Sequence, residues 1–243
     1  MEESIIEERD YELKNTNSEN TGYTVKIKTE KCFTFTDKNT DELAVIIPEI
    51  LDPTYGMYVW PCSVVLAQYI WWHRKSIRNK TILELGAGTS LPGIVAAKCG
   101  ADVVLSDSAD LPQCRDNCQQ SCHANGLAGV TVVGITWGRF DPGLLNLTSV
   151  DIILGSDCFY DTKDFEDILV TIAYLMDRNS NAEFWCTYQD RSSDRSLDYL
   201  LLKWNLKCEK IPLCTFDAES SCLAGSTLPG NHTIHMWIIK RKI

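Results

Sequence analysis

The sequence predicts an α/β fold in which a mostly parallel central sheet is covered by helices on both faces. From Thr81 onward, short apolar runs typical of buried strands alternate with longer segments of helical periodicity. Gly100 and Gly126 stand where two of these helices are expected to end, because glycine is favoured just past a helix C-terminus. The last two strand-like segments have no helix between them. We therefore expect an antiparallel hairpin at one edge of the sheet.

The chain divides into a tail and one folded domain. Residues 1–22 are acidic and rich in Asn, Ser and Thr, and we expect a disordered tail there. Residues 23–243 have the length and the ordinary globular composition of a single domain with a full core. Within this domain, residues 23–50 alternate between apolar and polar side chains, which predicts a small N-terminal β extension. Pro61 then begins a helix, since its missing N–H costs little in a first turn.

The remaining elements can be placed in order along the chain. In the β extension, two strands of a hairpin and a candidate third strand are expected at 24–28, 32–36 and 44–47. The later strands are expected at 81–85, 102–106, 130–134, 151–155, 183–188, 206–211 and 233–239. The helices are expected at 62–75, 91–99, 111–125, 162–176 and 193–204. Ligands of such sheets bind outside the carboxyl ends of the strands, so residues that follow the strands are the candidates for a site.

Composition limits the expected cellular location of the protein and the kinds of partner that it can bind. No run of eighteen apolar residues and no N-terminal signal peptide is visible, so we expect an intracellular protein without membrane contact. Its 11 cysteines are then expected to be reduced thiols. Cys114, Cys118 and Cys122 share one face of a predicted helix but lack a fourth ligand, so we expect structural cysteines and no metal site. The net charge of −10 argues against a nucleic-acid backbone as partner and is compatible with a basic protein substrate.

The most informative stretch joins the strand at 81–85 to the helix at 91–99. Gly86 and Gly88 remove Cβ where the backbone must turn tightly and lie against a ligand. Ser90 is the expected N-cap of the helix. This arrangement leaves N–H groups facing a crevice at the carboxyl end of a strand, where open α/β sheets bind ligands.

The residues around this turn indicate which ligand is bound. Leu91 replaces the third glycine or alanine of a dinucleotide fingerprint, and the Lys-Ser/Thr pair of a phosphate loop is absent. Glu84 precedes the glycines, and its carboxylate would repel a pyrophosphate but suits the ammonium of a methionine moiety. Asp107 ends the next strand, about twenty residues after the turn, where an acidic side chain can accept hydrogen bonds from both ribose hydroxyls. Together these residues favour S-adenosyl-L-methionine over NAD.

Further residues stand where a methyl-transfer site would need them. Trp60 comes just before the first helix and Trp137 follows the third strand of the main sheet, so their flat side chains could flank the methionine end and the adenine. Ser156, Asp157 and Tyr160 follow the strand expected beside the first, at the switch point of the sheet. Taken singly, each Trp is more often a core residue, and Asp157 has a helix cap as its alternative role.

Taken together, these residues resemble the family-16 methyltransferases, which are class I, seven-strand enzymes with a Rossmann-like fold. The resemblance extends from about residue 25 to 240 and rests on Trp60-Pro61, Glu84-Leu85-Gly86-Ala87-Gly88-Thr89, Ser106-Asp107, Thr136-Trp137-Gly138 and Asp157-x-x-Tyr160. It implies an enzyme that uses S-adenosyl-L-methionine to methylate protein side chains, mostly lysine, and releases S-adenosyl-L-homocysteine.

The resemblance also implies a role for each matching residue. Those that would contact the cofactor are Trp60, Glu84, Gly86, Ala87, Gly88, Asp107, Trp137 and Ser156. Asp157 and Tyr160 would face the acceptor as catalytic residues. Ser108 departs from the pattern, because several relatives carry Arg or Lys directly after the ribose-binding Asp.

The acceptor is the least determined part of this prediction. Segments 57–61, 91–100 and 226–230 are most similar to family members that methylate protein arginine, histone included, in the nucleus and cytoplasm. The resemblance thus implies a basic segment such as a histone tail as partner. Residue chemistry alone leaves both lysine and arginine open, since Asp161 and Asp164 could supply a second carboxylate for a guanidinium or simply stand at a helix N-terminus. We expect in-line transfer without a metal or a covalent intermediate.

Three alternatives compete with this interpretation. A non-catalytic binding module could keep the fold and hold the cofactor as a structural ligand, although intact Asp157 and Tyr160 argue against it. An NAD-linked oxidoreductase would need a glycine or alanine in place of Leu91. A small-molecule methyltransferase stays open, because the same cofactor half serves both kinds of enzyme.

Overall fold

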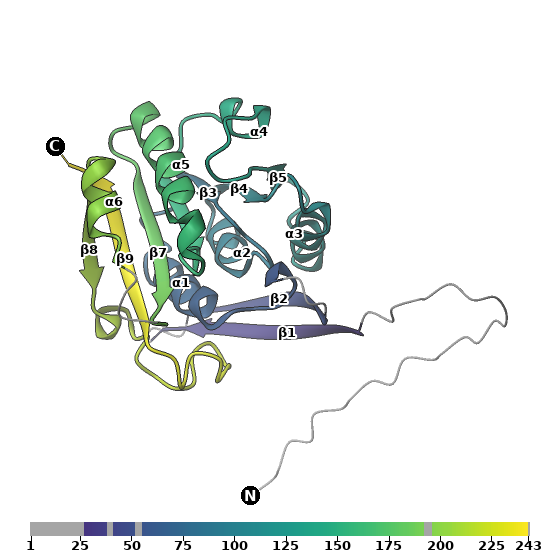
Figure 1. The fold of residues 1–243 in the computed structure, drawn as a ribbon. Coiled ribbons are helices and arrows are strands. Elements are labelled where there is room, and N and C mark those ends of the chain that lie inside the picture. The colour runs from purple at the N-terminus through teal and green to yellow at the C-terminus, as the bar shows by residue number, and fades with distance from the viewer. Residues whose placement is uncertain (1–26, 38–40, 52–54, 192–195, 243) are drawn as a thin grey trace, which may run out of the picture.

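A computed structural model describes residues 27–37, 41–51, 55–191 and 196–242, and Figure 1 shows its central sheet flanked by helices. Within these residues the sheet has seven strands, β3 (Thr81–Glu84), β4 (Asp102–Asp107), β5 (Thr131–Gly134), β6 (Ile152–Ser156), β7 (Glu183–Gln189), β8 (Leu206–Ile211) and β9 (Ile234–Arg241). Their order is β5-β4-β3-β6-β7-β9-β8. Strands β3 to β7 are parallel, and β9 pairs antiparallel with both β7 and β8. The predicted fold class, with its antiparallel edge pair, is confirmed.

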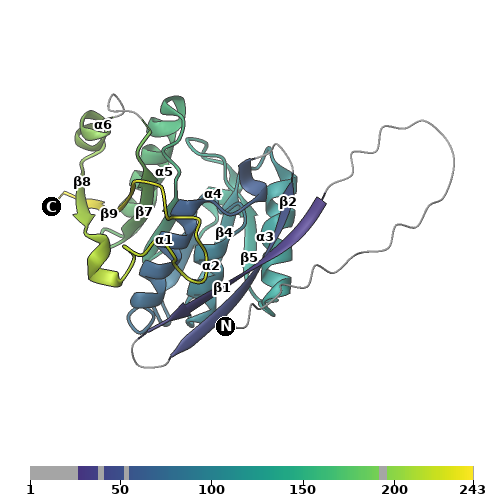
Figure 2. The same ribbon diagram turned by 90° about the horizontal axis from the view of Figure 1, so that it is seen from below.

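The helices divide between the two faces of the sheet (Figures 1 and 2). One face carries α1 (Pro61–Trp72), α2 (Leu91–Lys98) and α3 (Pro112–Ala124), and the other carries α4 (Pro142–Leu145), α5 (Phe165–Arg178) and α6 (Asp198–Lys203). Because side chains alternate along a strand, Ile82 of β3 packs on the side of α1 and α2, whereas Leu83 packs on the side of α5. Burial on both faces accounts for the continuous apolar run of this strand.

The N-terminal extension is a single antiparallel hairpin of β1 (Ile27–Thr36) and β2 (Glu42–Leu51). The expected break between strands at 24–28 and 32–36 is wrong. The chain runs straight through residues 29–31, which contain no Gly, Pro, Asn or Asp to turn it. The candidate third strand at 44–47 is therefore part of the second strand, and residues 24–26 lie outside the described residues.

This hairpin forms a third layer outside α2 and α3, and Figure 2 shows it lying across these helices. Phe33 and Phe35 of β1 are buried in the same core as the helices. At the end of α3, the Asn125 side chain accepts from the N–H of Ile46 at 3.1 Å and donates to its carbonyl at 2.6 Å. The extension is therefore an integral part of the domain.

Several boundaries differ from those expected. The first helix ends at Trp72, and the helix expected at 162–176 begins as a 3-10 helix, η2 (Thr162–Asp164), before α5. The helix expected at 193–204 is α6, which starts at Asp198, because Ser196 and Leu197 are not helical and residues 192–195 lie outside the described residues. Helix α4 is not predicted, since four residues are too few to show a helical period. Two further 3-10 helices are η1 (Tyr55–Met57) and η3 (Leu213–Phe216).

Other expectations concern the tail, the membrane and the thiols. The expected tail at 1–22 lies outside the described residues. In the described part of the chain, no helix is long and apolar enough to cross a membrane. All 11 cysteines are free thiols, and Cys114, Cys118 and Cys122 are buried along α3. The described residues contain no group of three His, Cys, Asp or Glu side chains placed to hold a metal.

Candidate active site

A cavity of about 400 Å³ opens at the carboxyl ends of the parallel strands. Its size falls in the range of small-molecule sites, roughly 300–1,000 Å³. The cavity is lined by the turn after β3, the segment between η1 and α1, and residues that follow β4, β5, β6 and β7. It thus lies at the sheet edge where the sequence places the candidate residues.

The turn after β3 presents bare backbone to this cavity. Gly86 and Gly88 have φ angles of +60° and +52°, a region that favours glycine. A Cβ atom on Gly86 would lie 2.7 Å from Cζ2 of Trp137, which lines the cavity from the β5 side. The Gly88 N–H donates to Oδ2 of Asp107 at 2.8 Å and so fixes the turn against β4. Both the conformation and the space at this turn therefore require glycine.

Asp107 ends β4 and faces the cavity beside the turn. Its Oδ1 accepts the Ser108 N–H at 2.8 Å, in addition to the bond from Gly88. Burial raises the pKa of Asp107, and the two N–H donors oppose this rise. Each carboxylate oxygen keeps an acceptor position in this arrangement, so Asp107 can still receive hydroxyl groups from a ligand.

Glu84 does not line the cavity, which corrects the expectation that it faces an ammonium group. Its side chain is fully buried, Oε2 accepts the Gly93 N–H of α2 at 2.9 Å, and Oε1 has no hydrogen-bond partner among the described residues. Burial raises its pKa to about 8. The physical reason is strand alternation, because Glu84 shares the strand face of Ile82 and so points beneath α2.

Tyr58 and Trp60 form a second wall of the cavity, and their ring centroids lie 4.9 Å apart. Val59 between them is buried, and its N–H donates to Oε1 of Glu49 at 2.6 Å. Glu49 belongs to β2, is only 5% exposed and also pairs with Lys31 of β1 at 3.0 Å. The hairpin thus holds this wall of the cavity in place.

The other end of the cavity is built by residues at the end of β6. Asp157 has a φ of +55°, and its N–H donates to the carbonyl of Thr187 in β7 at 2.8 Å. Both of its carboxylate oxygens accept from the guanidinium of Arg191, with Nη1 to Oδ1 at 2.8 Å and Nη2 to Oδ2. Tyr160 stands at the rim and is 38% exposed. The site therefore ends in a buried carboxylate that an arginine of the same chain neutralises.

Asp161 and Asp164 do not join Asp157 in the cavity. Asp161 accepts the Lys163 N–H at 3.1 Å and pairs with the Lys163 ammonium at 2.9 Å, so it caps η2. Asp164 occupies the N-cap position of α5. The interpretation of these residues as charges at a helix N-terminus is confirmed.

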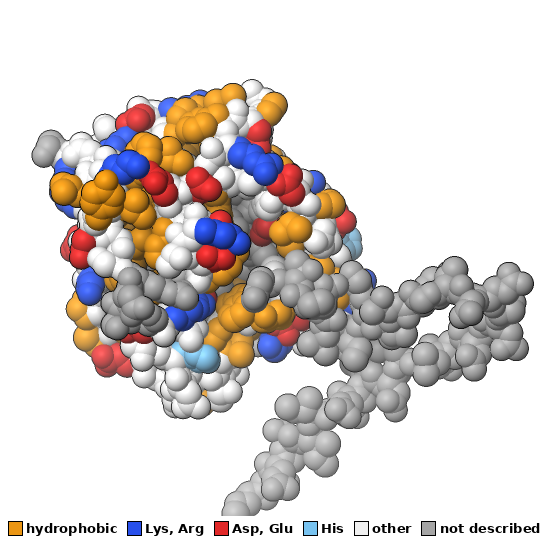
Figure 3. Space-filling model, viewed as in Figure 1, with side chains coloured by type: hydrophobic (Ala, Val, Ile, Leu, Met, Phe, Trp, Pro, Cys, Tyr) orange, Lys and Arg blue, Asp and Glu red, His pale blue; other side chains and the backbone are white. Residues whose placement is uncertain are grey.

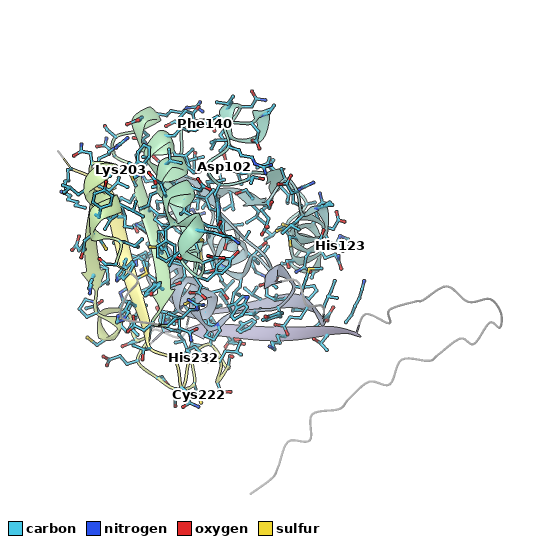
Figure 4. The ribbon with its side chains drawn as sticks, viewed as in Figure 1. Asp102, His123, Phe140, Lys203, Cys222 and His232 are labelled. Atoms are coloured by element: carbon cyan, nitrogen blue, oxygen red, sulfur yellow. The ribbon has the colours of Figure 1, made fainter. Side chains whose placement is uncertain are left out.

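The connection between β8 and β9 lies next to the end of β7. In Figure 4, His232 and Cys222 of this connection lie at the end of the sheet where β7 terminates, and Phe140 lies at the opposite end. Nδ1 of His232 is 2.8 Å from Nε2 of Gln189, the last residue of β7. Figure 3 shows acidic and basic side chains interspersed over the face seen in Figure 1.

The structure brings most of the predicted site residues together around one cavity. These residues are Trp60, Gly86, Ala87, Gly88, Asp107, Trp137, Ser156, Asp157 and Tyr160. Sequence reasoning missed Glu49 and Arg191. The signal for Arg191 is its place two residues after β7, which neighbours β6 in the parallel sheet. Ser90 holds the N-cap position of α2 as expected, but its φ is +64° and its side chain makes no capping bond.

These residues fit S-adenosylmethionine. The turn at Gly86 and Gly88 is a cradle that side chains would fill, and Asp107 offers acceptors for ribose hydroxyls. Trp60 and Trp137 supply flat apolar surface on the cavity walls. A mostly parallel seven-stranded sheet with this turn after its first parallel strand defines a class I, S-adenosylmethionine-dependent methyltransferase.

Comparison with known proteins identifies the family. The model of family-16 methyltransferases, described as lysine methyltransferase, matches residues 39–202. The chain belongs to this family. It is therefore a protein methyltransferase, and its methyl donor is S-adenosylmethionine. The alternative of a non-catalytic binding module is not supported.

The relatives and structural neighbours agree with this assignment. Histone-arginine methyltransferase METTL23 of Xenopus laevis is 61% identical over 202 residues, covering 83% of this chain and 86% of that protein. METTL23 of Homo sapiens is 58% identical over 183 residues, covering 75% and 96%. Protein N-lysine methyltransferase METTL21A of Xenopus tropicalis is 36% identical over 124 residues, covering 50% and 56%. The expected similarity to members of the family that methylate protein arginine is thus confirmed for the chain as a whole.

A solved structure supports the fold at low sequence identity. Magnesium protoporphyrin IX methyltransferase of Synechocystis PCC 6803, with bound S-adenosylmethionine, aligns with a TM-score of 0.52 and 13% identity. The alignment covers 75% of this chain and 80% of that chain. At this sequence identity, the structural similarity supports the fold alone.

Proposed function

We propose that this enzyme methylates an arginine side chain in a basic segment of a protein, such as a histone tail. The observation that carries the proposal is the geometry of Asp157, whose two carboxylate oxygens receive the two η nitrogens of a guanidinium. A carboxylate held in this orientation suits arginine, because a lysine ammonium offers only a point charge. The names of the relatives at 61% and 58% identity, histone-arginine methyltransferases, support the same acceptor.

In this proposal the residues of the cavity divide between donor and acceptor. Bound S-adenosylmethionine supplies the methyl group, which passes from its sulfonium sulfur to an acceptor nitrogen in one in-line displacement and leaves S-adenosylhomocysteine. The backbone of 86–88 and the Asp107 carboxylate hold the donor, and Trp60 and Trp137 flank it. Asp157 orients the acceptor nitrogen and is the carboxylate at hand for the proton that this nitrogen loses. Tyr160 closes the acceptor side against water.

The proposal extends to partners and location. We expect the enzyme to act in the nucleus and the cytoplasm. A histone acceptor would require its presence in the nucleus. Its net charge of −10 favours a basic protein partner and opposes a nucleic-acid backbone, and we expect no membrane partner. Charges of both signs are interspersed over the face in Figure 3, so this face has no single basic or acidic patch to select the acceptor.

The test combines labelled extract with mass spectrometry. The purified enzyme is incubated with labelled S-adenosylmethionine and either core histones or a cell extract, and labelled peptides are sequenced. We expect methylarginine in a basic segment. Label found on lysine alone would contradict the proposed acceptor, and label confined to small molecules would contradict a protein substrate.

A variant pair tests the role of Asp157. Asp157→Asn is expected to bind the donor like the parent but to lower kcat by about two orders of magnitude, a typical loss for one electrostatic group at a reacting centre. Asp161→Asn is the matched control, because Asp161 is a nearby aspartate that caps η2 outside the cavity. Equal methylation by Asp157→Asn and the parent would refute the assigned role.

A further inference from the structure

Arg191 is the only basic side chain among the described residues that line the cavity. It follows β7 and reaches across to Asp157 at the end of β6. The contact uses both η nitrogens and both carboxylate oxygens, with Nη1 to Oδ1 at 2.8 Å. This is the fork geometry in which a carboxylate would bind an acceptor arginine. Arg191 and the proposed acceptor thus compete for the same two oxygen atoms.

The surroundings of Asp157 explain why an internal cation is present. The Asp157 side chain is 7% exposed, and besides Arg191 it contacts the Gln189 N–H, 3.4 Å from Oδ1, and the buried Cys62 thiol. An ionised carboxylate buried to this degree is strongly unfavourable without a partner cation. Exchanging one guanidinium for another keeps the buried carboxylate paired throughout. If Arg191 moved away and no other cation took its place, the buried carboxylate would be left unpaired.

The Arg191 side chain is also placed so that it can move away from Asp157. It is 25% exposed, against 7% for Asp157, so part of this side chain already contacts water. Within the described residues, its remaining hydrogen bond joins Nη1 to the carbonyl of Gln189, two residues earlier, at a long 3.3 Å. No described element other than the end of β6 and its own strand anchors this guanidinium. Turning it into solvent therefore breaks one hydrogen bond within the described residues besides the ion pair itself.

We infer that Arg191 occupies the place of the acceptor guanidinium in the free enzyme, and that an acceptor arginine displaces it from Asp157. This inference rests on the proposed function, because it takes Asp157 as the acceptor carboxylate. An acceptor guanidinium restores both hydrogen bonds that Arg191 gives up. A lysine ammonium restores a point charge and leaves the fork incomplete, so the exchange favours arginine over lysine. Arg191 thus lowers the affinity for the acceptor, and the fork of Asp157 sets the preference for arginine.

The experiment compares acceptor kinetics of Arg191→Ala and the parent on two peptides that differ only in Arg or Lys at the labelled position. We expect the acceptor KM of Arg191→Ala to fall by about tenfold, because the competing internal cation no longer reduces the competent fraction. The KM of the Lys peptide should fall by the same factor, because the internal cation reduces the competent fraction equally for both acceptors. Calorimetry with S-adenosylmethionine checks that the variant is folded and binds the donor.

Two further variants make the result specific. Arg191→Lys keeps the charge but loses the fork, so its acceptor KM should lie between those of Arg191→Ala and the parent. Arg74→Ala removes another arginine–aspartate ion pair, at the far end of α1, and should leave the acceptor KM and the preference unchanged.

The outcomes separate this inference from the proposed function. A lower kcat with unchanged acceptor KM in Arg191→Ala would overturn the inference, because Arg191 would then be a fixed support that positions Asp157. A raised acceptor KM would overturn it too. If the parent labels lysine and no arginine, the proposed acceptor fails and the selectivity falls with it. On the lysine peptide, a lower KM for Arg191→Ala than for the parent would then still support the displacement. An equal or higher KM would refute it.

Discussion

Glu84→Gln is expected to change how the stability of this enzyme depends on pH. Glu84 is fully buried beneath α2, and burial raises its pKa from an ordinary value of 4.5 to about 8. Between these two pH values the folded state keeps a proton on Glu84 that the unfolded state has lost. The stability linked to this proton is therefore fully present below pH 4.5, and it declines as the pH rises toward 8.

The size of this effect follows from the distance between the two pKa values. At about 1.4 kcal/mol for each pKa unit, the free energy of unfolding falls by about 5 kcal/mol over the whole range. Of this, about 3–4 kcal/mol falls between pH 5 and pH 8. Glutamine carries no charge at any of these pH values, so Glu84→Gln should lack this part of the pH dependence.

The assay is urea unfolding of the parent and Glu84→Gln at pH 5, 6, 7 and 8. The two curves are compared by slope, because the glutamine also adds a constant offset. Its amide would replace Oε1, which has no hydrogen-bond partner among the described residues, and a buried unsatisfied donor costs about 1–3 kcal/mol at every pH. Glu209→Gln, which removes an exposed carboxylate from β8, controls for net charge. Parallel curves for the parent and Glu84→Gln would refute the reasoning.

Three other substitutions test the turn, the cavity wall and the hairpin. Gly86→Ala should lower the affinity for S-adenosylmethionine by about tenfold or more in calorimetry, whereas Gly126→Ala, with a similar φ of +69° and no atom within 4 Å, should only cost stability. Glu49→Leu should weaken donor binding and cost about 1–3 kcal/mol of unfolding free energy, because it leaves the buried N–H of Val59 without an acceptor. Its control, Lys31→Met, removes the exposed half of the ion pair with Glu49 and should cost less than about 1 kcal/mol. Phe35→Ala should lower the unfolding free energy by about 3–5 kcal/mol in urea if the hairpin is integral to the core. Equal results for the members of either pair, or a negligible loss for Phe35→Ala, would contradict the corresponding role.

The sheet could be predicted because its strands and helices leave strong local signals. Apolar runs alternate with helical periods from Thr81 onward, and the parallel order follows from that alternation. The β extension was harder, because an alternating pattern marks a strand but not where it ends. Residues 29–31 lack every turn-forming residue, and this absence was the usable signal for one continuous strand.

The site shows a second limit of sequence reasoning. Motifs predict which residues reach the carboxyl edge of the sheet, but they do not give the direction of each side chain. Strand alternation could have placed Glu84 beneath α2, since Ile82 is two residues before it and faces the same helices. The pair of Asp157 and Arg191 joins residues 34 positions apart. Such a pair depends on the packing of two strands, and no local pattern contains it.

The two carboxylates that line the cavity are held in different ways, and the difference matches what each is proposed to bind. Asp107 is fixed by the N–H groups of Gly88 and Ser108, which belong to the backbone and stay in place when a ligand arrives. Backbone donors leave room for neutral hydroxyl groups, so nothing needs to be displaced for ribose to bind. Asp157 is instead neutralised by the side chain of Arg191, which can move. A carboxylate that must receive a cation cannot remain paired with a permanent one, because the acceptor would then bring an uncompensated charge into a buried site. An exchangeable partner solves this problem for Asp157, and the fork of two oxygen atoms that it vacates makes the shape of the incoming cation matter.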